Sequence, residues 1–211
     1  MAVETAVEEA LRAVPDRALA AAGRSRGWVL LAATRAHPSE QGDLLARRMV
    51  DRGSGPGDGG TRLVAGLGRT VEDLHRVVES YHEAFLATRA ALLVPRLGDL
   101  VHWGDLGPYD LLLRLPAEEV RRASDAAALR LLADADTTGV LVDTLESFLD
   151  HAGDVRGAAE AMCVHRATLY YRLRRIEQRT GCSLASGHDR LALHLAVKLR
   201  RLAAVQAGTG G

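Results

Sequence analysis

Residues 164–181, VHRATLYYRLRRIEQRTG, combine five arginines with two adjacent tyrosines. Arginine side chains can pair with phosphates or form forked hydrogen bonds to guanine, so this composition favours a polyanionic partner. The same segment repeats apolar residues at Val164, Leu169, Leu173 and Ile176. This spacing predicts a helix that packs on one side and presents arginines and aromatics on the other.

A helix-turn-helix unit would position these residues. Leu169, Leu173 and Ile176 form one stripe at the helical period of 3.6 residues, so we expect them to face a core. A short helix over 155–162 and a tight turn precede them, and Ala158 and Ala159 would let the two helices approach closely. The start of the second helix, 165–180, would then lie in the major groove of DNA.

Position on this helix predicts the role of each side chain. The first turns should reach base edges, through Arg166, Ala167, Thr168 and Tyr171. The phosphates should be contacted by Tyr170, Arg172, Arg174 and Arg175. With His165, which starts the helix, the predicted DNA-binding residues are His165, Arg166, Ala167, Thr168, Tyr170, Tyr171, Arg172, Arg174 and Arg175.

The charge of the chain is divided unevenly between its two parts. The formal net charge is zero, but residues 163–211 hold nine Lys or Arg and two acids, and residues 1–162 hold 18 basic and 25 acidic residues. An acidic body with a basic end indicates a polyanion-binding module attached to another domain. The alternative is an interaction or small-ligand-sensing module whose basic helix docks an acidic protein.

The composition also restricts the class of protein. With 47% hydrophobic residues the chain can form a packed core. The first eleven residues contain Glu4, Glu8 and Glu9 where a signal peptide would be basic, and the longest apolar run, 28–33, is too short to cross a membrane. We therefore expect a cytoplasmic protein that does not contact membranes.

Helix and strand patterns alternate before residue 135. We expect helices over 3–22 (interrupted at Pro15), 40–52 (capped by Ser39), 70–91 (capped by Thr70), a short one after Pro108, and 117–133; strands over 27–35, 61–68 and 99–106; and a flexible loop over 52–60. This predicts an α+β domain over 1–135, with a single sheet and flanking helices. Residues 136–211 should form an all-α helix-turn-helix domain, with helices over 140–153, 155–162, 165–180 and 187–205.

Residues 141–199 resemble the C-terminal helix-turn-helix domain of the PucR family of transcriptional regulators. The matching positions are Leu145, Phe148, Leu149, Gly153, Asp154, Ala159, Val164, His165, Arg166, Thr168, Leu169, Tyr171, Arg172, Leu173, Ile176, Glu177, Thr180, Gly181, Asp189, Arg190, Leu191, Ala192 and Leu193. Family members usually have Asn and Arg where this chain has Ala167 and Tyr170. The resemblance implies the fold and DNA binding, while these two outward positions alter the expected base preference.

Residues 62–116 resemble the family's middle domain, a degenerate relative of the GGDEF fold. A nucleotide cyclase needs a Gly-Gly turn followed by acids that hold Mg²⁺, and the candidate GPGDGGT at 55–61 has one acid. We therefore expect no enzymatic activity. The resemblance also implies a ligand-sensing domain ahead of both parts, for which 211 residues leave no room.

No cofactor or metal is expected. Cys163, His165, Cys182 and His188 lack the spacing of zinc ligands, and Cys163 is expected as a small buried residue of the turn. One recognition helix covers few base pairs, so we expect a homodimer or larger assembly on double-stranded DNA. The helices 70–91 and 189–204 are the candidate self-association surfaces. The sequence leaves a small-molecule effector open as a further partner and does not specify its identity.

Overall fold

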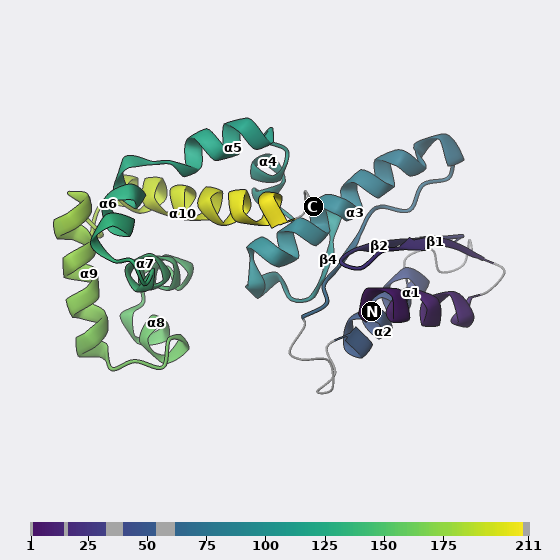
Figure 1. Cartoon of the computed structure of the whole chain (residues 1–211), viewed down its shortest axis with the longest axis horizontal. Coiled ribbons are helices and arrows are strands. Elements are labelled where there is room, and N and C mark those ends of the chain that lie inside the picture. Colours follow the sequence, from purple (N-terminus) through teal and green to yellow (C-terminus); the bar gives the residue numbers. More distant parts are fainter. Residues whose placement is uncertain (1, 15–16, 33–39, 54–61, 209–211) are drawn as a thin grey trace. The chain divides into compact units, whose positions relative to one another are not determined.

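The computed structural model of the chain describes residues 2–14, 17–32, 40–53 and 62–208. These residues form two compact units, Met1–Arg114 and Leu115–Gly211 (Figure 1). The described part of the first unit mixes helices and strands, and that of the second contains helices and no strand. Ser39, Pro15 and residues 54–60 of the expected loop lie outside the described residues.

The first unit contains four α-helices, four short strands and three 3₁₀ turns among its described residues. Its elements are α1 (Ala2–Ala13), β1 (Ala18–Ala22), β2 (Gly27–Leu31), α2 (Glu40–Gly53), β3 (Ala65–Leu67), the 3₁₀ turn Leu74–Arg76, α3 (Val77–Leu93), the 3₁₀ turn Pro95–Leu97, β4 (Leu100–His102), the 3₁₀ turn Trp103–Asp105 and α4 (Tyr109–Leu113).

The described strands form two separate sheets, which corrects the expectation of a single one. β1 pairs antiparallel with β2, with Ala18 opposite Leu31, and β3 pairs parallel with β4, with Ala65 opposite Leu100. The sequence pattern predicts a helix over residues 18–22, and alanine by itself favours helices. Their pairing with the apolar strand GWVLL overrides that local preference, since ladder hydrogen bonds and packing decide strand formation.

Two glycines allow α3 to lie directly on β3. A Cβ atom added to Gly66 would lie 2.2 Å from the carbonyl oxygen of Ala84, and one added to Gly68 would lie 2.0 Å from that of Ser80. One face of α3 is thereby fixed against the strand.

The start of this helical segment differs from the expected one. Asp73, rather than Thr70, caps the 3₁₀ turn that precedes α3, because its side chain accepts a hydrogen bond from the backbone N–H of His75 at 2.9 Å.

The second unit consists of six helices over its described residues. They are α5 (Ala117–Ser124), α6 (Ala127–Ala135), α7 (Val140–Asp150), α8 (Val155–Ala161), α9 (Arg166–Thr180) and α10 (Gly187–Gly208). The segment expected as one helix over 117–133 is thus two, with a break at Asp125–Ala126.

The units divide at Arg114 and Leu115 rather than at the expected 135–136. α5 packs on α10 and α6 packs on α9, and Leu129 and Leu132 are buried in the core that also holds Leu169. The polar stretch 134–139 therefore connects two helices of one core. A change in composition marks a surface connection, but only packing shows whether that connection separates domains.

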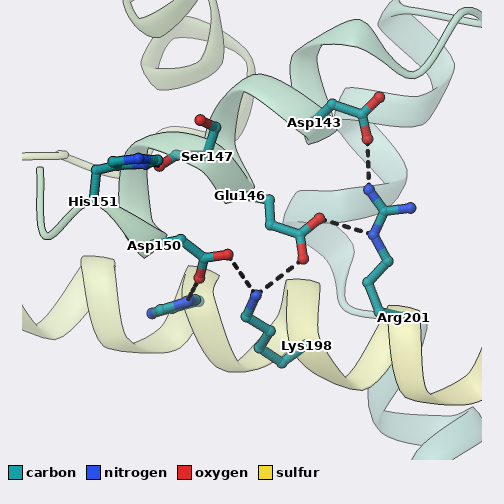
Figure 2. A network of polar contacts seen from close by, with 8 residues as sticks. Asp143, Glu146, Ser147, Asp150, His151, Lys198 and Arg201 are labelled. Carbon is teal, nitrogen blue, oxygen red and sulfur yellow. Dashed lines mark hydrogen bonds and ion pairs between the residues drawn. The ribbon is translucent and has the colours of Figure 1, made fainter. Parts of the chain in front are cut away.

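A ladder of ion pairs joins α7 to α10 (Figure 2). Lys198, which is 2% exposed, places Nζ 3.0 Å from Glu146 Oε1 and 2.8 Å from Asp150 Oδ2. Arg201 Nε donates to Glu146 at 2.8 Å, and Asp150 also contacts His194 Nε2 at 2.8 Å. Every charge in this group has an opposite charge within hydrogen-bond distance, which offsets the cost of burying the ammonium group.

The carboxyl group of Asp150 shows the effect of these partners. Burial alone would raise its pKa, but hydrogen bonds from His194 and Lys198, with their charges, lower that pKa to about 2. Because the folded-state pKa lies below the ordinary value of 3.8, this carboxylate stabilises the fold above about pH 4. That contribution is lost as the pH falls towards 2.

We predict that Lys198→Met lowers the free energy of unfolding of the second unit by about 3 kcal/mol at pH 7, since it removes the buried cation that joins the partly buried carboxylates of Glu146 and Asp150. Urea unfolding followed by circular dichroism measures this loss. Without Lys198 the pKa of Asp150 should rise, so the difference between variant and wild type should shrink between pH 5 and pH 2.

Arg130→Met is the matched control for Lys198→Met. Arg130 pairs with Asp125 at 3.2 Å, but both side chains are about 60% exposed, and exposed ion pairs contribute little. Equal unfolding midpoints for Lys198→Met and the wild type at pH 7 would contradict a stabilising role for the ladder.

Candidate nucleic-acid interface

α8 lies beside the N-terminal end of α9 (Figure 1). Asp154 caps α8 by accepting hydrogen bonds from the backbone N–H groups of Arg156 at 2.9 Å and Gly157 at 3.0 Å. Ala158 and Ala159 are fully or almost fully buried in the core that also contains Leu169. The methyl side chains let the two helices approach closely, as expected from the sequence.

The turn between α8 and α9 is a Schellman motif. Cys163 has φ of 54°, its N–H donates to Glu160 O at 3.1 Å, and the N–H of Val164 donates to Ala159 O at 3.0 Å. Val164 then packs against the core. Cys163 itself is exposed, which corrects the expectation that it is buried. In this left-handed backbone conformation the Cys163 side chain points outward. The apolar contact with the core is made by Val164 instead.

The rotation of α9 about its axis is set by three buried side chains. Leu169 and Ile176 are completely buried and Leu173 is 7% exposed, so the predicted inward stripe is confirmed. The helix begins at His165, whose Nδ1 accepts a hydrogen bond from the N–H of Ala167 at 3.2 Å, and ends at Gly181, with φ of 70°. The capping bond requires the proton of a neutral His165 ring to reside on Nε2.

Most predicted contact residues lie on the open side of α9. Tyr170 is 54% and Tyr171 65% exposed, although aromatic side chains are usually buried to a greater extent. The exposed predicted residues are His165, Arg166, Ala167, Thr168, Tyr170, Tyr171 and Arg174. Within the described residues, Arg166 and Arg174 make no ion pair, so their guanidinium groups remain available to an anion.

Arg172 and Arg175 are half-buried. The Nη1 atom of Arg172 lies 3.5 Å from Thr144 Oγ1, a buried hydroxyl. Hydrogen bonds from Thr138 and from the N–H of Leu141, together with the charge of Arg175, lower the pKa of Asp136. These two arginines therefore also support the packing of α9.

A hollow of about 250 Å³ lies on the same side of α9. It is lined by Tyr171, Arg174, Arg175, Gln178 and Arg179. Three guanidinium groups around one hollow can hold a phosphate group by charge-assisted hydrogen bonds. The predicted set omits Arg179, although its spacing of four from Arg175 and eight from Tyr171 places it on their side of the helix.

Across the described ranges, no group of three or more His, Cys, Asp or Glu side chains has an arrangement that could hold a metal ion. None of the helices in those ranges combines the length and hydrophobicity needed to traverse a lipid bilayer. Among the described residues, the cationic face of α9 is the candidate functional site.

Comparison with known families identifies both parts of the chain. Residues 141–199 match the PucR C-terminal helix-turn-helix domain, which contains α7, α8, α9 and the first half of α10. Residues 1–90 match the GGDEF-like domain. The second match begins at residue 1, whereas the resemblance described from the sequence covers residues 62–116.

Named regulators are among the proteins similar to this chain. The carbohydrate diacid regulator of Escherichia coli (strain K12) is 35% identical over 94 residues, which cover 43% of this chain and 24% of that protein. The purine catabolism regulatory protein of Bacillus subtilis (strain 168) is 29% identical over 93 residues, covering 44% and 18%. The DNA-binding transcriptional activator AdeR of the same organism is 33% identical over 69 residues, covering 33% and 16%.

This chain spans about a quarter or less of the length of these relatives. The two family matches follow one another in the order that the sequence resemblance implies. Named regulators among the relatives agree with these matches. The chain therefore contains a GGDEF-like domain followed by a PucR C-terminal helix-turn-helix domain, and it is similar in sequence to PucR/CdaR-type transcriptional regulators.

Proposed function

We propose that this chain regulates transcription by binding double-stranded DNA, with the N-terminal half of α9 in the major groove. One observation carries the proposal: Leu169 is completely buried while its neighbours Thr168 and Tyr170 are exposed. A helix anchored in this way presents a rigid outer face, and the major groove is wide enough to admit it. The family relationship supports the same function.

The exposed residues divide between two kinds of contact. Arg166, Thr168 and Tyr171 belong to the first two turns of α9, where side chains can reach base edges. Tyr170 and Arg174 are placed for phosphates, together with Arg175. Arg172 makes a smaller contribution to DNA binding in this proposal, because its guanidinium group also lies near Thr144.

The proposed role is regulatory and has no catalytic step. The named relatives are regulators, and the only cyclase-like candidate segment, at 55–61, has a single acid. Acting on DNA, the protein would reside in the cytoplasm with the chromosome. Two copies would read half-sites about 34 Å apart, or a multiple of this distance, along one face of the duplex.

Selection of bound fragments from the source genome tests DNA binding directly. We expect enrichment of a sequence that random duplex DNA competes for poorly, because specific complexes are at least about a thousandfold tighter than non-specific ones. Equal competition by random DNA would instead favour the alternative in which the basic helix docks an acidic protein.

Arg166→Ala should relax sequence choice as well as weaken binding. Loss of a bidentate contact to guanine lowers the binding free energy at the correct site by about 1–3 kcal/mol. The binding free energy for non-specific duplexes falls by less. Fluorescence anisotropy with the selected duplex and with single-base variants measures this effect. If Arg166→Ala kept the full discrimination between these duplexes, base reading would have to be reassigned to other residues.

Arg174→Ala should weaken binding to all duplexes alike. Loss of one phosphate contact should reduce the slope of log K against log salt by about 0.9 and leave the ratio between specific and random duplexes unchanged. Arg122→Ala is the matched control, since this exposed arginine of α5 pairs with Glu119 at 3.1 Å. A salt slope that moved equally in both variants would argue against a phosphate contact at Arg174.

A further inference from the structure

An apolar row is exposed along α3 and the 3₁₀ turn before it. Leu74 is 81% exposed, Val78 60%, Tyr81 48%, Phe85 37% and Leu92 40%. Another side of α3 lies on β3, where Gly66 and Gly68 meet its backbone. Monomeric proteins rarely leave a contiguous apolar surface of this kind open, so the row marks an interaction surface.

The spacing of the row is that of a coiled-coil seam. Positions 74, 78, 81, 85, 88 and 92 alternate steps of four and three, which is the a/d pattern of a heptad repeat. Thr88, which is half-buried, occupies the position between Phe85 and Leu92 at the border of the contact with β3, where its Oγ1 atom would lie 2.6 Å from a Cβ atom added to Gly66. No charged residue occupies any of the six positions. A seam of this pattern fits a second helix.

α10, the other candidate for self-association, has its apolar residues engaged within the second unit. Leu193 and Leu202 are 2% and 0% exposed, and Val197 is completely buried. Leu191 and Leu195 remain exposed on α10, a shorter row than that of α3. The exposed fractions therefore favour α3 as the self-association surface.

The row on α3 is complementary to its own reversed copy. In an antiparallel pair, each a position faces a d position of the partner helix. One twofold axis at the level of residue 83 places position 74 opposite 92, position 78 opposite 88 and position 81 opposite 85. Leucine then meets leucine, valine meets the threonine methyl group, and tyrosine meets phenylalanine. A single axis that satisfies all three pairs is what a symmetric dimer requires.

The exposed area is also sufficient for a modest interface. Aromatic side chains present roughly 150–250 Å² each and aliphatic ones somewhat less, so the exposed fractions amount to roughly 500 Å² per chain. Two copies would bury about 1,000 Å² in total, near the lower limit of specific interfaces. Interfaces of this size are typical of weak, reversible associations.

We propose that the occupant of this surface is a second copy of the chain, whose α3 packs antiparallel on the first along positions 74–92. The dimer depends on the GGDEF-like unit alone and forms without DNA. An experiment can therefore show that this dimer does not form without showing that α9 does not bind DNA, and the reverse.

Sedimentation of the full chain without DNA tests the proposal. We expect a dimer at micromolar concentration. The dissociation constant should be at least tenfold larger for Leu74→Glu combined with Val78→Glu. Leu111→Glu is the matched control, because this leucine of α4 is 71% exposed and lies outside the row. A monomeric wild-type chain, or a dimer that the α3 double variant leaves intact, would overturn the proposal.

Disulfide cross-linking tests the register even if the glutamate variant does not fold. In a background of Cys163→Ser and Cys182→Ser, Leu74→Cys with Leu92→Cys should form an intermolecular disulfide under mild oxidation. Leu74→Cys alone should not, because an antiparallel arrangement separates the two copies of position 74 by about 27 Å along the helix axis. Cross-linking of the single variant, or none in the double variant, would refute the antiparallel pairing.

Discussion

The burial of Leu169, Leu173 and Ile176 is the interaction on which the proposed DNA contacts depend. These three side chains fix the rotation of α9, so the exposed arginines and tyrosines have no freedom to turn towards the core. The Schellman turn at Cys163 fixes where the helix begins, and the His165 cap fixes its first turn. The surface proposed to face DNA is therefore a consequence of core packing, and its precision comes from the rigidity of closely packed side chains.

The packing behind α9 draws on more of the chain than the helix-turn-helix pair. α6 and α7 both contact α9, and α10 is tied to α7 by the ladder around Lys198. Arg172 approaches Thr144 of α7, and the charge of Arg175 acts on Asp136, which precedes α7. An unpaired buried charge would be costly here, so the ladder selects one alignment of α7 and α10 and supports the helices that hold α9.

The two units have different tasks in the proposed regulator. The helical unit provides the contacts to DNA, while the GGDEF-like unit leaves an apolar seam on α3 whose positions are related by one twofold axis. Dimerisation through one unit and DNA binding through the other would double the number of contacted base pairs without altering α9. Affinity for a full operator would then depend on both surfaces.

The local periodicity of the sequence determined the existence of most helices, the inward stripe of α9 and the helix-turn-helix pattern. A 3.6-residue repeat can be recognised in the sequence without knowledge of any distant contact. The resemblance of residues 141–199 added the family. Only the tertiary structure decided that residues 18–22 form a strand, that α5 and α6 belong to the second unit, and that Arg172 approaches Thr144. Each of these depends on contacts between residues far apart in the chain, and such contacts override local propensity when they provide hydrogen bonds or burial that the segment alone cannot.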